Sequence, residues 1–148
     1  MAQASARITL AATPDRVWQL IGGFDSLPDW LPYIPRSELS EGGRVRSLLN
    51  PAGDAIVERL EAFDNDARSY TYSILRAPFP VTGYRSTLRV VGLDDDRAVR
   101  VEWSGRFTPA GVSDEQASDL FEGIYRDGLA ALRDTLATLC LLYTSRCV

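Results

Sequence analysis

The chain has 148 residues, of which 45% are hydrophobic and 24% are charged, a composition typical of one soluble globular domain. Its formal net charge is −4, and all 16 basic residues are arginines spread along the chain, which argues against nucleic acid or an anionic membrane surface as a partner. Because the sequence has no histidine, a Ser-His-Asp triad is excluded and a zinc site loses its commonest ligand.

The sequence predicts a single cytoplasmic domain. No stretch approaches the roughly 18 apolar residues of a membrane span, and the N-terminal MAQASARITL lacks the charged and apolar regions of a signal peptide. No linker or internal repeat divides residues 1–140, which we expect to form one ligand-binding domain. Residues 141–148, LLYTSRCV, break the pattern before them and are interpreted as a tail without an assigned role.

The first predicted elements are a strand and two short helices. Residues 6–12 alternate between apolar and polar side chains, as a half-buried strand does. A helix follows, with Thr13 as its cap, Pro14 at the first helical position and glycines 22–23 at its end. A second short helix is predicted over 26–31.

A run of strands comes next. The last strand alternates well, with one apolar and one polar face, which indicates an antiparallel sheet with one face in water. The acidic run 94–96 before it is interpreted as a solvated hairpin turn, with a carboxylate-only metal site as the alternative. The predicted strands are 42–49, 55–63, 68–75, 81–93 and 98–107.

The final predicted element is a long amphipathic helix. Ser113 and Gln116 have the spacing of a capping box at its start. Runs of strands followed by one helix predict an α+β fold, with the helix packed on one face of the sheet. The apolar stripe recurs at three- and four-residue steps through Ala117, Leu120, Phe121, Ile124, Gly128, Leu132 and Leu136.

Four segments resemble one known family. They are TPDRVWQLIGGFDSLPDWLPYI, IVERLEAFD, VEWSGRF and FEGIYRDGLAALRDTL, and in this order they are similar to the START, or polyketide cyclase/dehydrase, superfamily, also called SRPBCC. The resemblance implies a helix-grip fold, in which a curved antiparallel sheet wraps around the C-terminal helix and leaves a deep cavity. Members of the family bind lipids, sterols, polyketides or hormones, and a minority catalyse cyclisation, dehydration or condensation. The family is therefore a guide to the fold more than to the chemistry.

Arg46 and Glu58 form the best-defined polar pair. If residue 48 pairs with 56 across the turn at 50–54, Arg46 faces Glu58 on the face that looks toward the helix. Such a pair can anchor a polar group of a ligand or fix the sheet, whereas a bulge would turn it into a surface ion pair. A paired arginine lowers the pKa of a carboxylate, so a closed pair predicts that Glu58 orients a ligand and does not accept its proton.

Aromatic and apolar side chains are predicted to line the cavity, although each also suits a plain core position. The connector FDSLPDWLPYIP, residues 24–35, is unusually apolar and should close one end of the groove. Tyrosine hydroxyls would orient a guest among apolar walls. The predicted ligand-binding residues are Trp30, Leu31, Tyr33, Tyr70, Tyr72, Tyr84, Trp103, Phe121 and Tyr125.

Three functions remain open from the sequence. The first is binding of a small hydrophobic or aromatic molecule, lipid- or polyketide-like, in the internal cavity. The second is a cofactor-free polyketide cyclase or dehydratase, a lyase or isomerase without metal or nucleotide, in which Glu58 and Arg46 are the candidate catalytic residues. The third is a groove that holds a peptide or a protein partner.

Overall fold

The computed structural model describes residues 1–142, with side chains as far as residue 139. Helix α3 includes the first two residues of the predicted tail, and the rest of that tail, 143–148, lies outside the described residues. The elements follow in the order β1 (Ala2–Leu10), α1 (Pro14–Ile21), α2 (Leu27–Trp30), β2 (Arg36–Ser40), the short 3-10 helix η1 (Glu41–Gly43), β3 (Val45–Leu49), β4 (Ala55–Asp64), β5 (Ser69–Arg76), β6 (Val81–Leu93), β7 (Ala98–Pro109) and α3 (Asp114–Leu142).

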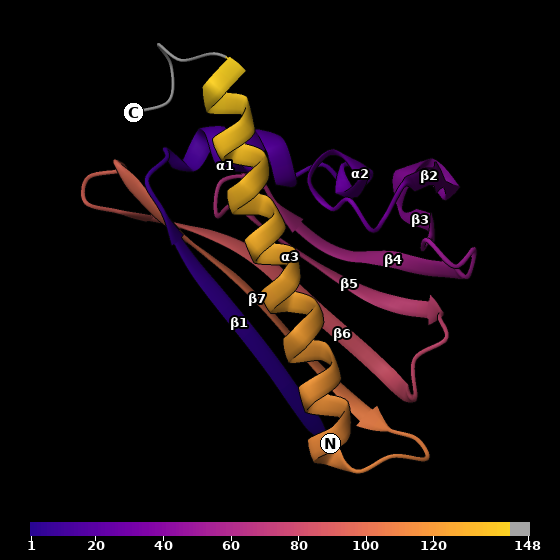
Figure 1. Ribbon diagram of the computed structural model, residues 1–148. Helices are drawn as coiled ribbons and strands as arrows, with labels where there is room; N and C mark the ends of the chain where they lie inside the picture. The colour runs from indigo at the N-terminus through magenta and orange to yellow at the C-terminus, as the bar shows by residue number, and fades with distance from the viewer. Residues whose placement is uncertain (143–148) are drawn as a thin grey trace.

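The strands form one antiparallel sheet of seven strands in the order β1-β7-β6-β5-β4-β3-β2. Helix α3 crosses one face of this sheet along β1 and β7, while α1 and α2 cover one end (Figure 1). This arrangement is the predicted helix-grip fold. None of the described helices is long and apolar enough to cross a membrane.

Local sequence signals explain where the helices begin. The Thr13 side chain accepts a hydrogen bond from the Arg16 backbone N–H at 3.3 Å, at the start of α1. At the start of α3 the Ser113 N–H donates to Gln116 Oε1 at 2.9 Å, and the Gln116 N–H donates to Ser113 Oγ at 3.0 Å. Both predicted caps are confirmed.

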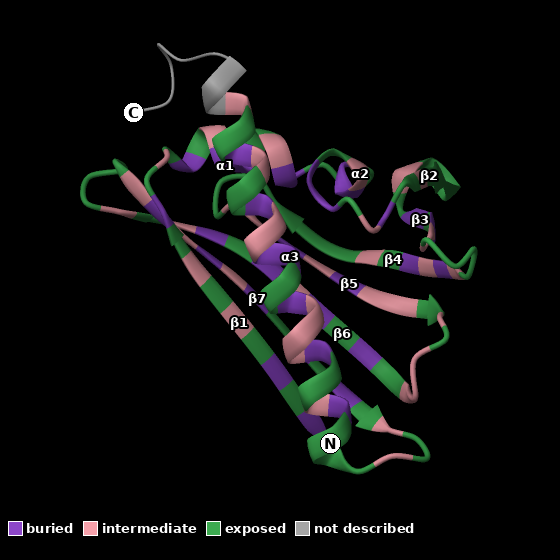
Figure 2. Cartoon of the chain, in the orientation of Figure 1, coloured by how far each residue is buried: buried purple, intermediate pink, exposed green. Residues whose placement is uncertain are grey.

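The core lies between α3, the inner face of the sheet and the connector. On β7, buried residues alternate with more exposed ones, as Figure 2 shows. The connector side chains Phe24, Leu31 and Ile34 are buried. Burying one such side chain contributes about 1.5–3 kcal/mol, so the connector is part of the core.

Several parts of the fold differ from the prediction. Strand β1 spans Ala2–Leu10 in place of the predicted 6–12, and the first residues of the predicted strand 42–49 belong to the 3-10 helix η1. Strand β2 was not predicted, because four of its five residues are polar, most are exposed and no apolar face alternates. Leu120 was placed on the buried stripe of α3, but its side chain is 38% exposed. At about 100° per residue, Leu120 lies roughly 60° outside the buried arc that runs from Ala117 to Leu129, which explains the error.

Candidate functional site

A cavity of about 230 Å³, partly open to solvent, lies between α3, the inner face of strands β3 to β7 and the connector. It forms because α3 packs along the β1 and β7 side of the sheet and leaves space over the strands beyond. Its wall is mostly apolar. The predicted site residues that line it are Leu31, Tyr33, Arg46, Glu58, Tyr72, Tyr84, Trp103, Phe121 and Tyr125.

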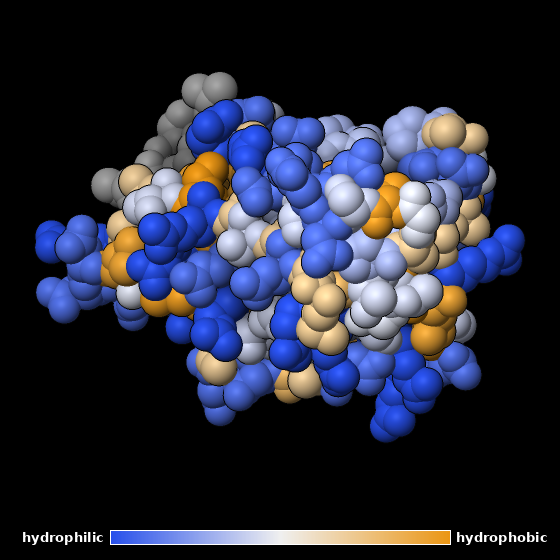
Figure 3. Space-filling model, turned by 90° about the horizontal axis from the view of Figure 1, so that it is seen from below, coloured by the Kyte–Doolittle hydropathy of each residue, from blue (hydrophilic) through white to orange (hydrophobic). Residues whose placement is uncertain are grey.

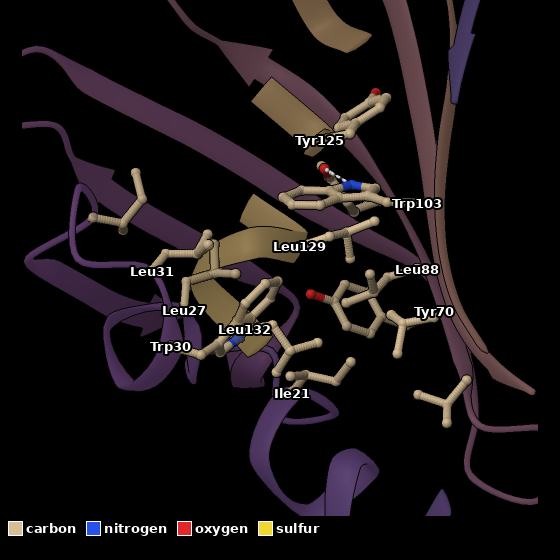
Figure 4. Packing of buried hydrophobic residues seen from close by; sticks show 14 of the residues in the cluster. Ile21, Leu27, Trp30, Leu31, Tyr70, Leu88, Trp103, Tyr125, Leu129 and Leu132 are labelled. Carbon is tan, nitrogen blue, oxygen red and sulfur yellow. Dashed lines mark hydrogen bonds between the residues drawn. The ribbon is translucent and has the colours of Figure 1, made fainter. Parts of the chain in front are cut away.

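Two predicted residues, Trp30 and Tyr70, are not part of this lining, because their rings are packed behind it. Trp30 lies beside Leu27 and Leu132 in Figure 4, and its ring centroid is 5.8 Å from that of Trp103. Tyr70 is equally buried, among rings near the end of the sheet that α1 covers.

The predicted register of the β3–β4 hairpin is confirmed, with Arg46 opposite Glu58. Arg46 Nε donates to Glu58 Oε1 at 2.7 Å, and Nη2 of the same guanidinium lies 2.7 Å from that oxygen. The Arg46 side chain is 1% exposed and the Glu58 side chain 8%. The pair is therefore a buried ion pair and not a surface one.

Arg46 also connects the sheet to the connector. Its Nη1 donates to the Phe24 carbonyl oxygen at 3.0 Å and to the Tyr70 hydroxyl at 3.2 Å. The guanidinium carbon lies 4.2 Å from the Phe24 ring centroid and 4.7 Å from that of Tyr72. Aromatic faces stabilise a cation in place of water, so Arg46 is held on several sides by its own chain.

Burial acts on the two charges of this pair in different ways. Burial raises the pKa of Glu58, and the Arg46 guanidinium beside it, which lowers that pKa, offsets only part of the effect. Burial on its own lowers the pKa of Arg46, but Tyr70 and Glu58 outweigh it and the guanidinium remains charged. The expected lowering of the Glu58 pKa omitted the cost of removing a carboxylate from water.

Three tyrosine hydroxyls meet along one wall of the cavity. The Tyr72 and Tyr84 hydroxyls lie 3.4 Å apart, and the Tyr84 hydroxyl forms a short hydrogen bond with that of Tyr125. Trp103 Nε1 donates to the Tyr72 hydroxyl and to Ser86 Oγ, each at 3.1 Å. The rings of Trp103 and Tyr125 stack in the same region (Figure 4).

The three tyrosine hydroxyls are hydrogen-bond partners of one another. Several buried hydroxyls suggest a wet pocket, because each needs a partner, but these three satisfy one another to a large extent. Burial raises the pKa of Tyr125 to about 12 and that of Tyr72 and Tyr84 well above the usual value, so all three are neutral near pH 7.

Two glycines make room for the network. A side chain at Gly105 would overlap the Tyr125 hydroxyl, and a Cβ at Gly128 would lie 2.6 Å from the Trp103 ring and 2.9 Å from the Tyr33 hydroxyl. Helix α3 and the sheet therefore approach each other closely at Gly128. Gly83 has a positive φ of 61° and lies at a register shift between β6 and β7.

Sequence reasoning missed several residues at the site. Ser86, which joins the Trp103 indole to the Ser104 carbonyl, was detectable as a polar residue on an otherwise apolar inner face of β6. Most of the others are apolar residues that look like ordinary core, and their role depends on the distance between α3 and the sheet, whereas Asn50 and Pro51 lie in the turn between β3 and β4. The further lining residues are Leu27, Ile34, Leu48, Asn50, Pro51, Ile56, Ile74, Phe79 and Ile124.

The rest of the surface offers a weaker candidate. A larger depression of about 620 Å³ lies mainly over the outer face of the sheet, where short hydroxyl side chains and Arg85 and Arg106 line it. The face seen in Figure 3 is largely hydrophilic, with hydrophobic residues in small separate groups. Within the described residues, no three His, Cys, Asp or Glu side chains lie close enough together to hold a metal ion.

Comparison with known proteins agrees with this architecture. The protein XoxI from Bacillus cereus is 59% identical, with a TM-score of 0.87, over 90% of this chain and 94% of that one. A Bacillus thuringiensis protein is 56% identical, with a TM-score of 0.88, over 90% and 97%. The ZhuI aromatase/cyclase from Streptomyces sp. R1128 shares the fold, with a TM-score of 0.69 and 18% identity over 90% of this chain and 89% of that one. The model of the polyketide cyclase/dehydrase and lipid transport family matches residues 1–137, and the chain belongs to this family.

Proposed function

We propose that the protein binds a small hydrophobic or aromatic molecule in the cavity between α3 and the sheet. The observation that carries the proposal is a space of about 230 Å³ whose wall is mostly apolar, with a few polar groups at fixed positions. A cavity of roughly 150 Å³ in another protein holds benzene. The volume here therefore suits a substituted ring or a short chain, and it is too small for a peptide segment with its side chains.

A cavity-filling variant tests the proposal. Ile124 is half-buried on α3 and lines the cavity, whereas Leu120, one turn earlier on the same helix, is exposed and does not line it. Ile124→Trp should abolish binding of a fluorescent apolar dye and of ligands retained in native mass spectrometry. Leu120→Trp is the matched control and should bind as the unmodified protein does. Binding that survives in Ile124→Trp, or a protein that takes up no apolar probe, would contradict the proposal.

A cofactor-free cyclase or dehydratase is the second candidate, and Glu58 is the reason to consider it. Its carboxyl lines the cavity, and burial moves its pKa upward, toward the range in which a carboxylate exchanges protons near neutral pH. Such an enzyme would convert a poly-β-carbonyl chain without added metal or nucleotide. Glu58→Gln should then stop turnover while an apolar probe still binds, and equal turnover by both proteins would exclude this role for Glu58.

A further inference from the structure

The outer face of the sheet concentrates positive charge. Helix α3 lies over the opposite face (Figure 1). Because every second residue of a strand points to the same side, the strands bring together arginines that are spread along the sequence. The carboxylates in the same rows are fewer, namely Glu61, Asp64 and Glu102. The arginines of the outer face are Arg7, Arg59, Arg85, Arg89, Arg100 and Arg106.

A trough crosses the middle of this face, where the depression of about 620 Å³ lies. Five strands at a spacing of about 4.8 Å make its floor roughly 19 Å long, and the rows on its two sides are about 13 Å apart. An α-helix with its side chains is about 10–12 Å wide, so the trough has the dimensions to receive one. The floor is a row of short side chains paired from strand to strand: Ser5, Ser104, Thr87, Thr71 and Ala62.

Two arginines on one side of the trough need an anion from outside the chain. Arg85 and Arg106 face each other on adjacent strands, and like charges in this position destabilise a sheet. Arg85 is 3.8 Å from Glu61 and its side chain is 53% exposed. Among the described residues, Arg106 forms no ion pair.

The first turns of α3 carry the opposite charge. Residues 114–125 contain four acidic side chains and no basic one. Glu115, Asp119 and Gly123 follow at four-residue steps, so they lie along one side of the helix. In the described part of the chain, neither Glu115 nor Asp119 takes part in an ion pair.

Gly123 has no explanation within its own chain. A Cβ at this position would meet no atom within 4 Å, so packing does not require a glycine. Glycine in a helix interior is also less favourable than alanine. What a glycine does permit is the close approach of another backbone. The surface around Gly123 is therefore shaped for a contact with a second molecule.

We propose that this part of α3 lies in the trough of a second copy of the chain. Gly123 lies against the floor of short side chains, and Glu115 and Asp119 lie beside Arg85 and Arg106 of the neighbouring copy. The contact joins two different surfaces, so association continues beyond a dimer unless the assembly closes. The inference goes beyond the proposed binding function, because none of these five residues lines the cavity.

Sedimentation velocity of the unmodified protein over a range of concentrations tests the association. Charges act over about 30 Å at 0.01 M salt and over about 3 Å at 1 M. The average sedimentation coefficient should rise with protein concentration at the lower salt and return to that of a monomer at the higher. A protein that stays monomeric at the lower salt, or associates equally at both, would overturn the proposal and leave the cavity's function untouched.

Two variants assign the two surfaces. Arg85→Ser with Arg106→Ser alters the trough, and Gly123→Arg alters the helix, at positions where the side chain is exposed or has open space. Each variant alone should remain monomeric. An equimolar mixture should form a one-to-one complex, because one partner keeps the helix surface and the other keeps the trough. The matched control, Arg36→Ser with Arg44→Ser, removes two exposed arginines at the β2–β3 edge and should associate as the unmodified protein does.

The remaining outcomes also decide the proposal. A mixture of the two variants that stays monomeric would overturn it. Association that is lost in Gly123→Arg but persists in Arg85→Ser/Arg106→Ser would show that α3 pairs with α3, and would overturn it as well. Gly123→Ala should raise the melting temperature of the monomer at 1 M salt. A lower melting temperature would show that the fold itself needs this glycine, against the reasoning above.

Discussion

Replacing Arg46 by methionine should destabilise the protein by an amount that depends strongly on pH. The substitution leaves the Glu58 carboxylate 92% buried without its cation, since the side chain is 8% exposed. Removing one partner of a buried ion pair costs about 3–5 kcal/mol, and we expect that loss at about pH 8. The Phe24 carbonyl and the Tyr70 hydroxyl also lose a donor, which places the loss toward the upper end of this range.

The pH dependence has a definite sign. Burial already raises the pKa of Glu58, and without Arg46 that pKa rises further. Between the unfolded value of about 4.3 and the raised folded value, the folded state binds a proton that the unfolded state does not. The stability of the variant therefore falls as pH rises through this window and recovers as the carboxyl is protonated. Each pH unit in the window changes it by up to about 1.4 kcal/mol.

Urea unfolding of both proteins at about pH 5.5 and pH 8 measures this effect. The free energy of unfolding of Arg46→Met should be several kcal/mol below that of the unmodified protein at pH 8, and this deficit should be clearly smaller at pH 5.5. Glu58→Gln is the control, because it leaves a buried guanidinium that does not titrate here, so its deficit should not grow with pH. A deficit of Arg46→Met below about 1 kcal/mol, or one that is equal at both pH values, would refute the reasoning.

Two further predictions concern the tyrosines. Burial raises the pKa of Tyr33 and of Tyr125 to about 12, so the free energy of unfolding should fall as pH rises from 10 to 12. The absorbance of ionised tyrosine should increase together with unfolding measured by circular dichroism. Ionisation of all the tyrosines near pH 10 in a protein that is still folded would contradict this prediction. Gly105→Val should lower stability by about 1–3 kcal/mol in thermal unfolding because its side chain would overlap the Tyr125 hydroxyl, whereas an unchanged melting temperature would show that the network can move aside.

The features that the sequence predicted well depend on neighbouring residues. The caps at Thr13 and Ser113 need only three or four residues, and the pairing of Arg46 with Glu58 follows from one short hairpin. Each of these signals involves residues that are close together in the sequence, so a sequence pattern can reveal it. They were sufficient for the α+β order and for the position of the ion pair.

The features that could not be predicted depend on distances between elements. Trp30 and Tyr84 are both aromatic residues on buried faces, yet only Tyr84 lines the cavity, and the difference arises from how α2 packs against the sheet. The same holds for Ile124, whose position at the edge of the buried arc places it at the cavity. Predicting the direction in which the pKa of Glu58 shifts requires its degree of burial, because burial and Arg46 act in opposite directions, and the sequence does not give that burial.

The space between α3 and the inner strands has a consequence for finding the natural guest. A molecule that fills it completes the hydrophobic interior and binds only the folded chain, so it shifts the folding equilibrium by mass action. At a concentration of about 100 times its dissociation constant, such a molecule adds about 2.7 kcal/mol of stability. A melting-temperature screen of metabolite fractions would therefore identify the guest through the heat resistance that it confers, before any reaction is known.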